Sequence, residues 1–404
     1  MNSRNDWQRR SLTGEQILIT GGTGFLGANI ARHLVGEEDV PEESIRVFYM
    51  KGGPTWSLRD LPGIECWPGD ILEPEQVADA CGGRTLVFHA AGITSFDPRL
   101  KRIQWNINVE GTRNVLRAAA ESGTVRRICH TSTVNILGCP TPPGSFGTVA
   151  TCNPYASRPR LHSFGSTRET LAFADAVHEG RVSGAWERRI RIGYFDSKLA
   201  AQEIIDRAVR EDGMDVVSVL PGTFFGPLDT LVGPSLYIAL VRHNAIPAAS
   251  PAGFPLAHVE DVARGHVLAM TRGVPGSRYI VSGKPEDNRY LADMLRIIAE
   301  VVHEKEPHRR IRMRFSVMPR PLARVAAFFA EQAALLRGTP CLLSRAAARA
   351  GSFPSFYSND ETTRATGYVP QRSFQQAISD AYDFMGRNGL LDRAVRELDA
   401  FLLH

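Results

Sequence analysis

The feature that most constrains the fold of this 404-residue chain is a glycine-rich turn close to its beginning. An apolar run at residues 16–20 leads into Gly21-Gly22-Thr23-Gly24-Phe25-Leu26-Gly27, and an apolar helical pattern covers 25–35. A strand, a glycine turn and a helix amino-terminus in this order predict a phosphate-binding βα unit. Gly21 permits the tight turn, Gly24 lets a pyrophosphate approach the backbone, and Gly27 lets helix and strand pack closely.

The start of that helix is expected to hold the phosphates of a dinucleotide. Free backbone amides and the helix dipole favour an anion beside Thr23, Phe25 and Leu26. The second strand, at 45–49, has no acidic residue at its end to hold ribose hydroxyls, whereas Lys51 follows it. Lys51, with Arg46, can meet a 2′-phosphate, so we expect NADP, with NAD as the alternative. Lys51 can equally be a solvated loop residue.

The first half of the chain alternates short apolar runs with helical patterns, which predicts a parallel sheet covered by helices. The fold class expected is α/β, with a Rossmann-type doubly wound parallel sheet and a smaller, mainly helical C-terminal substrate-binding region. The expected strands are 16–20, 45–49, 86–89, 127–132 and 216–220, and the helices between them are 25–35, 102–121 and 194–210. A further strand is expected at 311–315.

The domain organisation expected from these patterns has five parts. They are a disordered arm at 1–13, a Rossmann domain at 14–222 with an insertion at about 139–190, a substrate-region segment at 223–258, a return to the Rossmann domain at 259–287, and the C-terminal region at 288–404.

Composition excludes several classes of function. The 47 basic and 43 acidic residues give a net charge of +4, too small an excess to indicate a nucleic-acid partner. The six cysteines show no paired metal spacing and indicate reduced thiols, so we expect no metal and a cytoplasmic location. No stretch reaches the length of a membrane span. Residues 322–336, interrupted by Arg324 and Glu331, suit an amphipathic helix that is expected to pack on a core rather than lie on a bilayer.

Tyr194 and Lys198 form a Tyr-x-x-x-Lys step on a predicted helix, which places phenol and ammonium on one face. A free tyrosine keeps its proton to about pH 10. A nearby cation favours phenolate and lowers that pKa, so Tyr194 is expected to act as an acid or base near neutrality.

The glycine turn and the Tyr194/Lys198 pair together resemble the extended type of the short-chain dehydrogenase/reductase superfamily. Other landmarks of that family follow in order along the chain. They are Gly69-Asp70-Ile71, His89-Ala90-Ala91-Gly92, Asn108 at the start of the fourth helix, 127–138 with its serine/threonine loop, Leu220-Pro221-Gly222-Thr223 and 258–263. The C-terminal segments 356–360 and 366–370 are most similar to dihydroflavonol-reductase, 3β-hydroxysteroid-dehydrogenase and hopanoid-associated members.

The resemblance implies roles for these residues. Asp70 and Ile71 would contact the adenine, Ala90, Ala91 and Gly92 would line the cofactor, and Pro221, Gly222 and Thr223 would lie beside the nicotinamide. Thr133, five residues before Gly138, would polarise the substrate oxygen, with Ser132 in support or capping a strand end. Lys198 would also bind the nicotinamide ribose. Asn108 would belong to a proton relay or stabilise the helix end. Family members often form homodimers through two helices beside the catalytic tyrosine.

A second tyrosine has better spacing but the wrong context. Tyr155 lies 22 residues after Thr133, whereas Tyr194 lies 61 after it, yet Pro159 stands where lysine is needed and prolines interrupt the helix. The extra length is therefore expected to be an insertion before the catalytic helix, either a wall or lid of the substrate pocket or a peripheral addition.

The expected function is an NADP-dependent oxidoreductase that interconverts a ketone and a secondary alcohol on a largely apolar small molecule. The stretch 248–257 contains no basic residue, which does not suit a sugar diphosphate. The alternatives are an epimerase or dehydratase that recycles its cofactor, and a non-catalytic NADP-binding sensor or scaffold.

Overall fold

A computed structural model describes residues 11–142, 144–157, 159–182, 185–339, 341 and 343–396. Of the arm expected at 1–13, residues 1–10 lie outside the described residues, and Leu12 is buried against the first strand's core. Among the described helices, none is both long enough and apolar enough to cross a bilayer.

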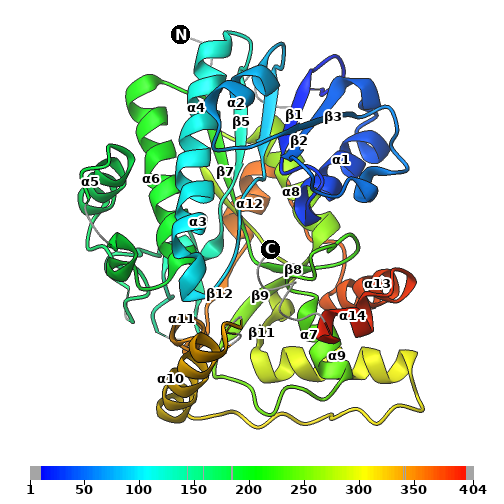
Figure 1. Ribbon diagram of the computed structural model, residues 1–404. Helices are drawn as coiled ribbons and strands as arrows, with labels where there is room; N and C mark the ends of the chain where they lie inside the picture. Colours follow the sequence, from blue (N-terminus) through cyan, green and yellow to red (C-terminus); the bar gives the residue numbers. More distant parts are fainter. Residues whose placement is uncertain are drawn as a thin grey trace.

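Seven parallel strands form the central sheet (Figure 1). They are β1 (Ile17–Thr20), β2 (Ile45–Met50), β3 (Glu65–Gly69), β4 (Leu86–His89), β5 (Arg127–Thr131), β7 (Val216–Pro221) and β10 (Arg278–Val281). Their spatial order is β10-β7-β5-β4-β1-β2-β3, so the direction of winding reverses between β1 and β4. A ligand crevice lies at such a switch point, outside the carboxyl ends of the strands.

Helices cover both faces of this sheet, which confirms the doubly wound Rossmann-type fold. Helices α1 (Phe25–Glu37) and α8 (Val259–Arg272) pack together on one face. Helices α2 (Pro74–Cys81), α4 (Gly111–Ser122) and α6 (Gly193–Asp212) cover the other (Figure 1). The helix expected at 102–121 is three segments: α3 (Lys101–Trp105), a π-helical turn (Asn106–Glu110) and α4.

A smaller unit follows the sheet. It contains a three-stranded sheet of β8 (Thr223–Phe225), β9 (Gly253–His258) and β11 (Asn288–Tyr290), with helices α7 (Leu236–Arg242), α9 (Leu291–Lys305), α13 (Phe374–Arg387) and α14 (Leu390–Arg396). The prediction of a strand at 311–315 is wrong. Ile311 and Phe315 pack against this unit's core, and the only pairing nearby in the described chain is an isolated bridge between Val317 and Ala249.

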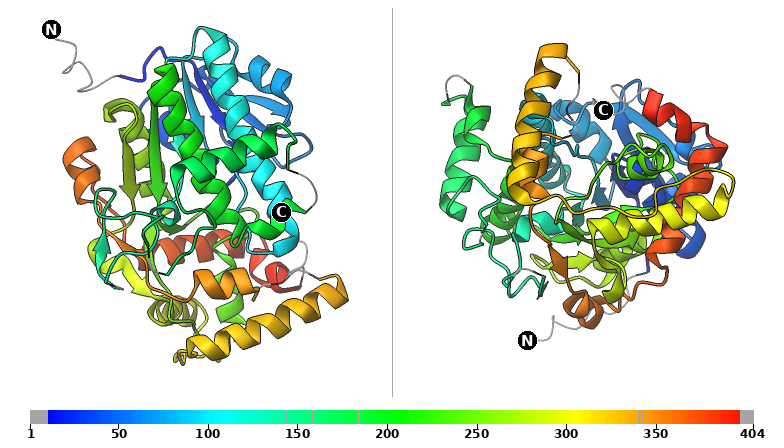
Figure 2. Two further views of the ribbon diagram at one scale, coloured as in Figure 1. Left: turned by 90° about the vertical axis from the view of Figure 1, so that its left-hand side faces the viewer. Right: turned by 90° about the horizontal axis from the view of Figure 1, so that it is seen from below.

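The stretch 139–190 is folded where the structure describes it. It contains β6 (Phe146–Gly147), paired with β12 (Phe356–Tyr357), and a helix, α5 (Thr167–His178). Figures 1 and 2 show α5 lying along the outer side of α6. Asp175 of α5 holds it there by ion pairs of 2.7 Å to Arg113 and 2.9 Å to Arg207. A dimer through the outer faces of α4 and α6 would have to accommodate α5.

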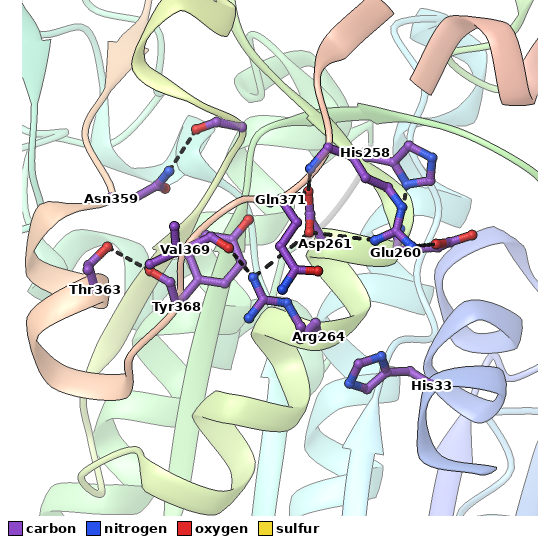
Figure 3. Close-up of polar contacts among 12 residues, drawn as sticks. His33, His258, Glu260, Asp261, Arg264, Asn359, Thr363, Tyr368, Val369 and Gln371 are labelled. Atoms are coloured by element: carbon purple, nitrogen blue, oxygen red, sulfur yellow. Dashed lines mark hydrogen bonds and ion pairs between the residues drawn. The ribbon is translucent and has the colours of Figure 1, made fainter. Parts of the chain in front are cut away.

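One C-terminal segment returns to the Rossmann unit (Figure 3). The buried carboxylate of Asp261 in α8 accepts hydrogen bonds from the backbone amides of Gln371 (3.0 Å) and Arg372 (2.8 Å). Helix α12 (Asp360–Thr366) follows Asn359, whose side-chain amide donates to the carbonyl oxygens of Ser282 and Gly283 beyond β10. The acid in the 258–263 signature therefore fixes the chain's return to the sheet.

Helices α10 (Arg320–Arg337) and α11 (Arg345–Ala350) form a hairpin at the lower edge of the molecule in Figure 1. Hydrogen bonds attach it to the loop after β4. The Ser344 hydroxyl donates to the carbonyl of Phe96 (2.6 Å), and Arg99 donates to the carbonyl of Gly338 (3.2 Å). The hairpin therefore lies next to the loop that borders the candidate site.

Candidate active site

The glycine turn has little space for side chains. Gly21 has φ +68°, and a Cβ there would lie 2.8 Å from the Cα of Ala91. At Gly27 a Cβ would lie 2.4 Å from the carbonyl oxygen of Gly21, so helix and strand approach as closely as the sequence predicts. Gly24 is more open, because its nearest neighbour would be 3.2 Å away.

The amino-terminus of α1 is suited to an anion. The first intrahelical hydrogen bond joins the Ala28 amide to the Gly24 carbonyl (3.0 Å), so the amides of Phe25, Leu26 and Gly27 precede it. In the described part of the chain no side chain caps this end, and its first turn has no acidic residue. These residues fit the pyrophosphate of a dinucleotide, which they would bind through amides and the helix dipole.

The two basic residues of the second strand have different surroundings. Arg46 is buried, pairs with Glu65 (2.8 Å) and lies 4.1 Å from the ring centroid of Trp67. It also donates to three backbone carbonyls, so it belongs to the packing of β2 and β3 and not to a 2′-phosphate site. Lys51 is exposed just after β2 and stays the candidate.

The expected adenine and turn residues lie at the ends of β3 and β4. Asp70 is exposed, and one carboxylate oxygen accepts from the Leu72 amide (2.9 Å), which orders the turn. Ile71 is buried against Gly111. The Ala90 amide donates to the Thr20 carbonyl of β1 (3.1 Å), and the Ala91 amide donates to the Thr20 hydroxyl (3.3 Å). Gly92, the next residue, is exposed.

A buried carboxylate fixes the start of helix α6. Asp196 is fully buried and accepts hydrogen bonds from the Ser163 amide (2.7 Å) and the Ser163 hydroxyl (2.5 Å). It also accepts from the Arg191 amide (3.2 Å) and from the amide of Ile192 (3.4 Å), the N-cap residue of α6, which a helix start leaves without an intrahelical partner. The inserted segment around Ser163 is thereby joined to α6 where Tyr194 lies in its first turn.

Tyr194 and Thr133 come together as expected, and Thr94 joins them. Burial raises the pKa of the Tyr194 phenol, and hydrogen bonds with the side chains of Thr133 and Thr94 lower it by less. The ring of Phe96 meets that of Tyr194 edge-on, with centroids 6.4 Å apart. Thr94 and Phe96 were not predicted, because the sequence around them carries no motif and only the loop's path brings them to the phenol.

Lys198 has another partner than the phenol. Its ammonium donates to the carbonyl of Thr131 at the end of β5 (2.9 Å) and lies 3.2 Å from where a Cβ on Gly92 would stand. Burial lowers the pKa of Lys198 to about 8. Among the described residues, Lys198 is not one of the groups that shift the Tyr194 pKa, so the expected lowering of that pKa by the ammonium is not seen.

Asn108 joins the loop after β4 to the catalytic helix. Its amide nitrogen donates to the Ile93 carbonyl and to the Ser197 hydroxyl, both at 3.0 Å, and its oxygen accepts from the Ile93 amide at 3.0 Å. The residue lies in the π-helical turn before α4, and such turns often occur at functional sites. These bonds fix Ile93, the neighbour of Thr94 in the chain, against α6.

The hydroxyls of Ser132 and Thr133, directly after β5, differ in their surroundings. Thr133 accepts from the Asn135 amide (3.3 Å) and begins a short 3₁₀ turn. The Ser132 hydroxyl is buried with no hydrogen-bond partner in the part of the chain that the structure describes. An unpaired buried hydroxyl costs free energy, so the site offers a polar group that a ligand can satisfy.

Tyr155 is engaged away from the cofactor loop. Its hydroxyl donates to Glu203 (2.7 Å), which lies in α6 between two and three turns after Tyr194. The same hydroxyl lies 3.1 Å from the hydroxyl of Thr170 in α5. These contacts join the loop that carries Tyr155 to α5 and α6. Arg158, which precedes Pro159, lies outside the described residues.

The residues expected beside the nicotinamide lie at the end of β7 and directly after it. Gly222 donates to the Val281 carbonyl (3.0 Å), and a Cβ on it would lie 2.3 Å from the Pro255 carbonyl. Pro221 is buried, and Thr223 begins β8. Phe224 meets Phe25 of the glycine turn with ring centroids 5.2 Å apart, so this segment closes over the same end of the sheet.

Comparison with known proteins agrees with this geometry. Residues 18–142 match the 3-beta hydroxysteroid dehydrogenase/isomerase family, and residues 159–282 match the NAD dependent epimerase/dehydratase family. The chain is 28% identical over 270 residues to sterol demethylase protein B of Methylococcus capsulatus, covering 66% of this chain and 69% of that protein.

Two further similarities extend over nearly the whole chain. A putative dihydroflavonol 4-reductase of Synechocystis is 26% identical and aligns over 92% of this chain and 95% of its own. The crystal structure of gox2253 superposes with a TM-score of 0.70 at 26% identity, covering 93% of this chain and 99% of that one. The chain thus belongs to the extended short-chain dehydrogenase/reductase superfamily, as an NAD(P)-dependent oxidoreductase.

Proposed function

We propose that the protein interconverts a ketone and a secondary alcohol on a largely apolar small molecule, with NADP as cofactor. The observation that carries the proposal is the phenol of Tyr194, a partly buried side chain, beside the Thr133 hydroxyl at the carboxyl end of β5. The parallel strands direct this end toward the glycine turn at the switch point of the sheet.

Each side chain has a distinct task. Thr133 and Tyr194 hydrogen-bond the substrate oxygen, and Tyr194 transfers the proton at its phenolic oxygen. Because burial raises the pKa of this phenol, it holds its proton and is suited to protonate the oxygen of a ketone under reduction. Lys198, next to Gly92, would hold the nicotinamide ribose. NADP, when bound, supplies or accepts the hydride.

Apolar side chains surround the phenol on the side of the insertion. They form one cluster with Tyr194: Phe96, Cys139, Leu161, Ile192, Phe195, Ala346, Ala350 and Phe353. Cys139 and Leu161 come from the insertion, so its first half supports a wall of the pocket, whereas α5 is peripheral. An apolar wall favours a ketone or alcohol on a hydrophobic skeleton over a sugar diphosphate.

Lys51 supports NADP over NAD. It is exposed at the end of β2, where an acid would otherwise bind the ribose hydroxyls. With Arg46 occupied by Glu65, Lys51 is the residue of this strand that can meet a 2′-phosphate.

Purified protein mixed with a panel of apolar ketones and either NADPH or NADH tests the proposal. We expect absorbance loss at 340 nm that depends on ketone and is faster with NADPH. Conversion of a nucleotide sugar without net cofactor oxidation would assign an epimerase instead. Tight NADPH binding without turnover of any ketone, alcohol or sugar would contradict an enzymatic role.

A further inference from the structure

Helix α10 has its apolar side chains on the wrong side for an ordinary surface helix. Its buried positions are small or polar: Ala323, Ala327, Glu331 and Ala334. Its large apolar side chains are exposed, from 44% for Phe328 to 89% for Leu336. The exposed set is Leu322, Val325, Phe328, Phe329, Leu335 and Leu336. A surface helix normally turns such a stripe toward the core.

The helix projects from the body, as Figures 1 and 2 show. Its packing is against α11, where Glu331 pairs with Arg345 (2.7 Å). Met313 and Val317 in the segment before α10 are exposed as well. An exposed apolar helix face of this kind marks a surface that binds something.

Charge identifies the kind of surface that would cover it. Residues 307–353 contain nine arginines and a single acidic residue, Glu331, so this segment carries +8 in a chain whose net charge is +4. Six of these arginines are exposed and form no ion pair with a carboxylate among the described residues: Arg310, Arg312, Arg314, Arg320, Arg324 and Arg337. The partner must therefore be both apolar and acidic.

We propose that α10 is an interfacial helix that docks this protein on an anionic lipid bilayer. Leu322, Val325, Phe329 and Leu336 recur on one helix face and would enter the boundary between headgroups and acyl chains. The surrounding arginines would meet lipid phosphates, with their stems along the apolar surface. A folded partner protein would offer pockets for the aromatic side chains, whereas a bilayer accepts a convex, projecting helix.

The position of the helix links docking to the site. The α10–α11 hairpin is hydrogen-bonded to the loop that carries Phe96, whose ring contacts Tyr194. Docking would bring the site's apolar wall close to the lipid phase. The benefit of this proximity rests on the proposed function, because only a lipophilic substrate would enter the site more readily from the lipid phase. The proposal that α10 binds the bilayer does not rest on the proposed function.

Sedimentation with vesicles tests the proposal without an activity assay. Vesicles of phosphatidylcholine alone are compared with vesicles containing about one third phosphatidylglycerol, at low and high salt. We expect the full-length protein to sediment with the anionic vesicles, and high salt to weaken this binding. The double variant Phe329→Gln/Leu336→Gln should bind them at least about tenfold more weakly, since two buried apolar side chains are lost.

Two further variants and a light-scattering measurement test whether binding depends on the apolar face and the arginines of α10. Val274→Gln removes an exposed apolar side chain away from α10 and should bind like the wild type. Arg324→Gln/Arg337→Gln should lose the preference for anionic vesicles. Equal binding by wild type and the Phe329→Gln/Leu336→Gln variant, or no binding to anionic vesicles, would overturn the proposal. So would a dimer in light scattering that this variant abolishes, because a second copy would then cover α10.

Discussion

Two opposing influences act on the pKa of the Tyr194 phenol. Burial raises its pKa, and hydrogen bonds with the Thr133 and Thr94 side chains lower it. Loss of either hydrogen bond should therefore raise the pKa further. Oxidation of an alcohol requires the phenolate, so this direction reports the phenol's pKa most directly.

Thr94→Val removes one of these hydrogen bonds while keeping the side chain's shape. We expect the acidic limb of the kcat/KM profile for alcohol oxidation to move to higher pH, because less phenolate forms at a given pH. Thr94→Ser keeps a hydroxyl and should restore the wild-type profile. Identical profiles for wild type and Thr94→Val would remove Thr94 from the site.

For single residues, the sequence predicted those positions that depend on spacing within one helix or turn. Tyr194 and Lys198 share helix α6 one turn apart, and the prolines around Tyr155 predict that it lies outside a helix of this kind. Thr94 could not be predicted in this way. Its place depends on the Asn108 hydrogen bonds to Ile93, which join loop and helix across 15 residues of sequence.

Among the elements, helix α1 provides a matched pair of glycines. A Cβ at Gly27 would lie 2.4 Å from a backbone carbonyl oxygen, whereas a Cβ at Gly36 would meet nothing within 4 Å. We expect Gly27→Ala to destabilise the protein by about 1–3 kcal/mol through overpacking and to weaken NADPH binding. Gly36→Ala should stabilise it by about 0.5–1 kcal/mol through helix propensity.

Urea unfolding and NADPH fluorescence titration on both variants check this prediction. The helix is the same in both, so a general intolerance of α1 to alanine would lower both midpoints. Wild-type midpoint and affinity in Gly27→Ala would show that the turn is looser than the structure indicates.

Five buried strands could be predicted because parallel strands read as apolar runs. Both edge strands of the central sheet were missed. The sequence of β3, Glu65-Cys66-Trp67-Pro68-Gly69, is not apolar, and the apolar run of β10 has only three residues, 279–281. The π-helical turn at 106–110 was missed because the helical pattern continues through it. Helix α5 was missed within a stretch rich in proline and glycine, although Ser166 caps its first turn.

For the whole molecule, one acidic residue joins three helices of the C-terminal unit. Glu306, just after α9, accepts from Arg242 of α7 (2.6 Å) and from the Tyr382 hydroxyl of α13. Burial raises the pKa of Glu306, but the hydrogen bonds from Arg242, Tyr382 and Arg309 outweigh this and hold it at about 2. A carboxylate with a lowered pKa stabilises the folded state above its unfolded pKa of 4.5.

This stability should be lost as the pH falls from 4.5 toward 2, because the unfolded state takes up the proton first. Glu306→Gln should therefore unfold at lower urea than the wild type at pH 7, and the two midpoints should converge below pH 4.5. Glu304→Gln, an exposed change on the same helix, should behave like the wild type. A wild-type advantage that stays constant from pH 7 to pH 4 would contradict the role of the charge.

For the whole molecule, the glycine turn and the alternation of strands and helices predicted the class of fold. They did not predict how the elements at the surface of the molecule pack. The pattern at 322–336 was expected to pack on a core, and the helix forms there with its apolar side chains exposed. Periodicity shows that a helix has an apolar face, and only the arrangement of the other elements decides what that face meets.

The most direct test of the central claim is turnover by Tyr194→Phe. With NADPH and a ketone accepted by the wild type, we predict a loss of about 10²–10⁴-fold in kcat, because the proton donor to the substrate oxygen is gone. NADPH affinity should be unchanged, and Tyr155→Phe should keep near wild-type kcat. Retained turnover in Tyr194→Phe would contradict the assignment of the chemistry to this phenol.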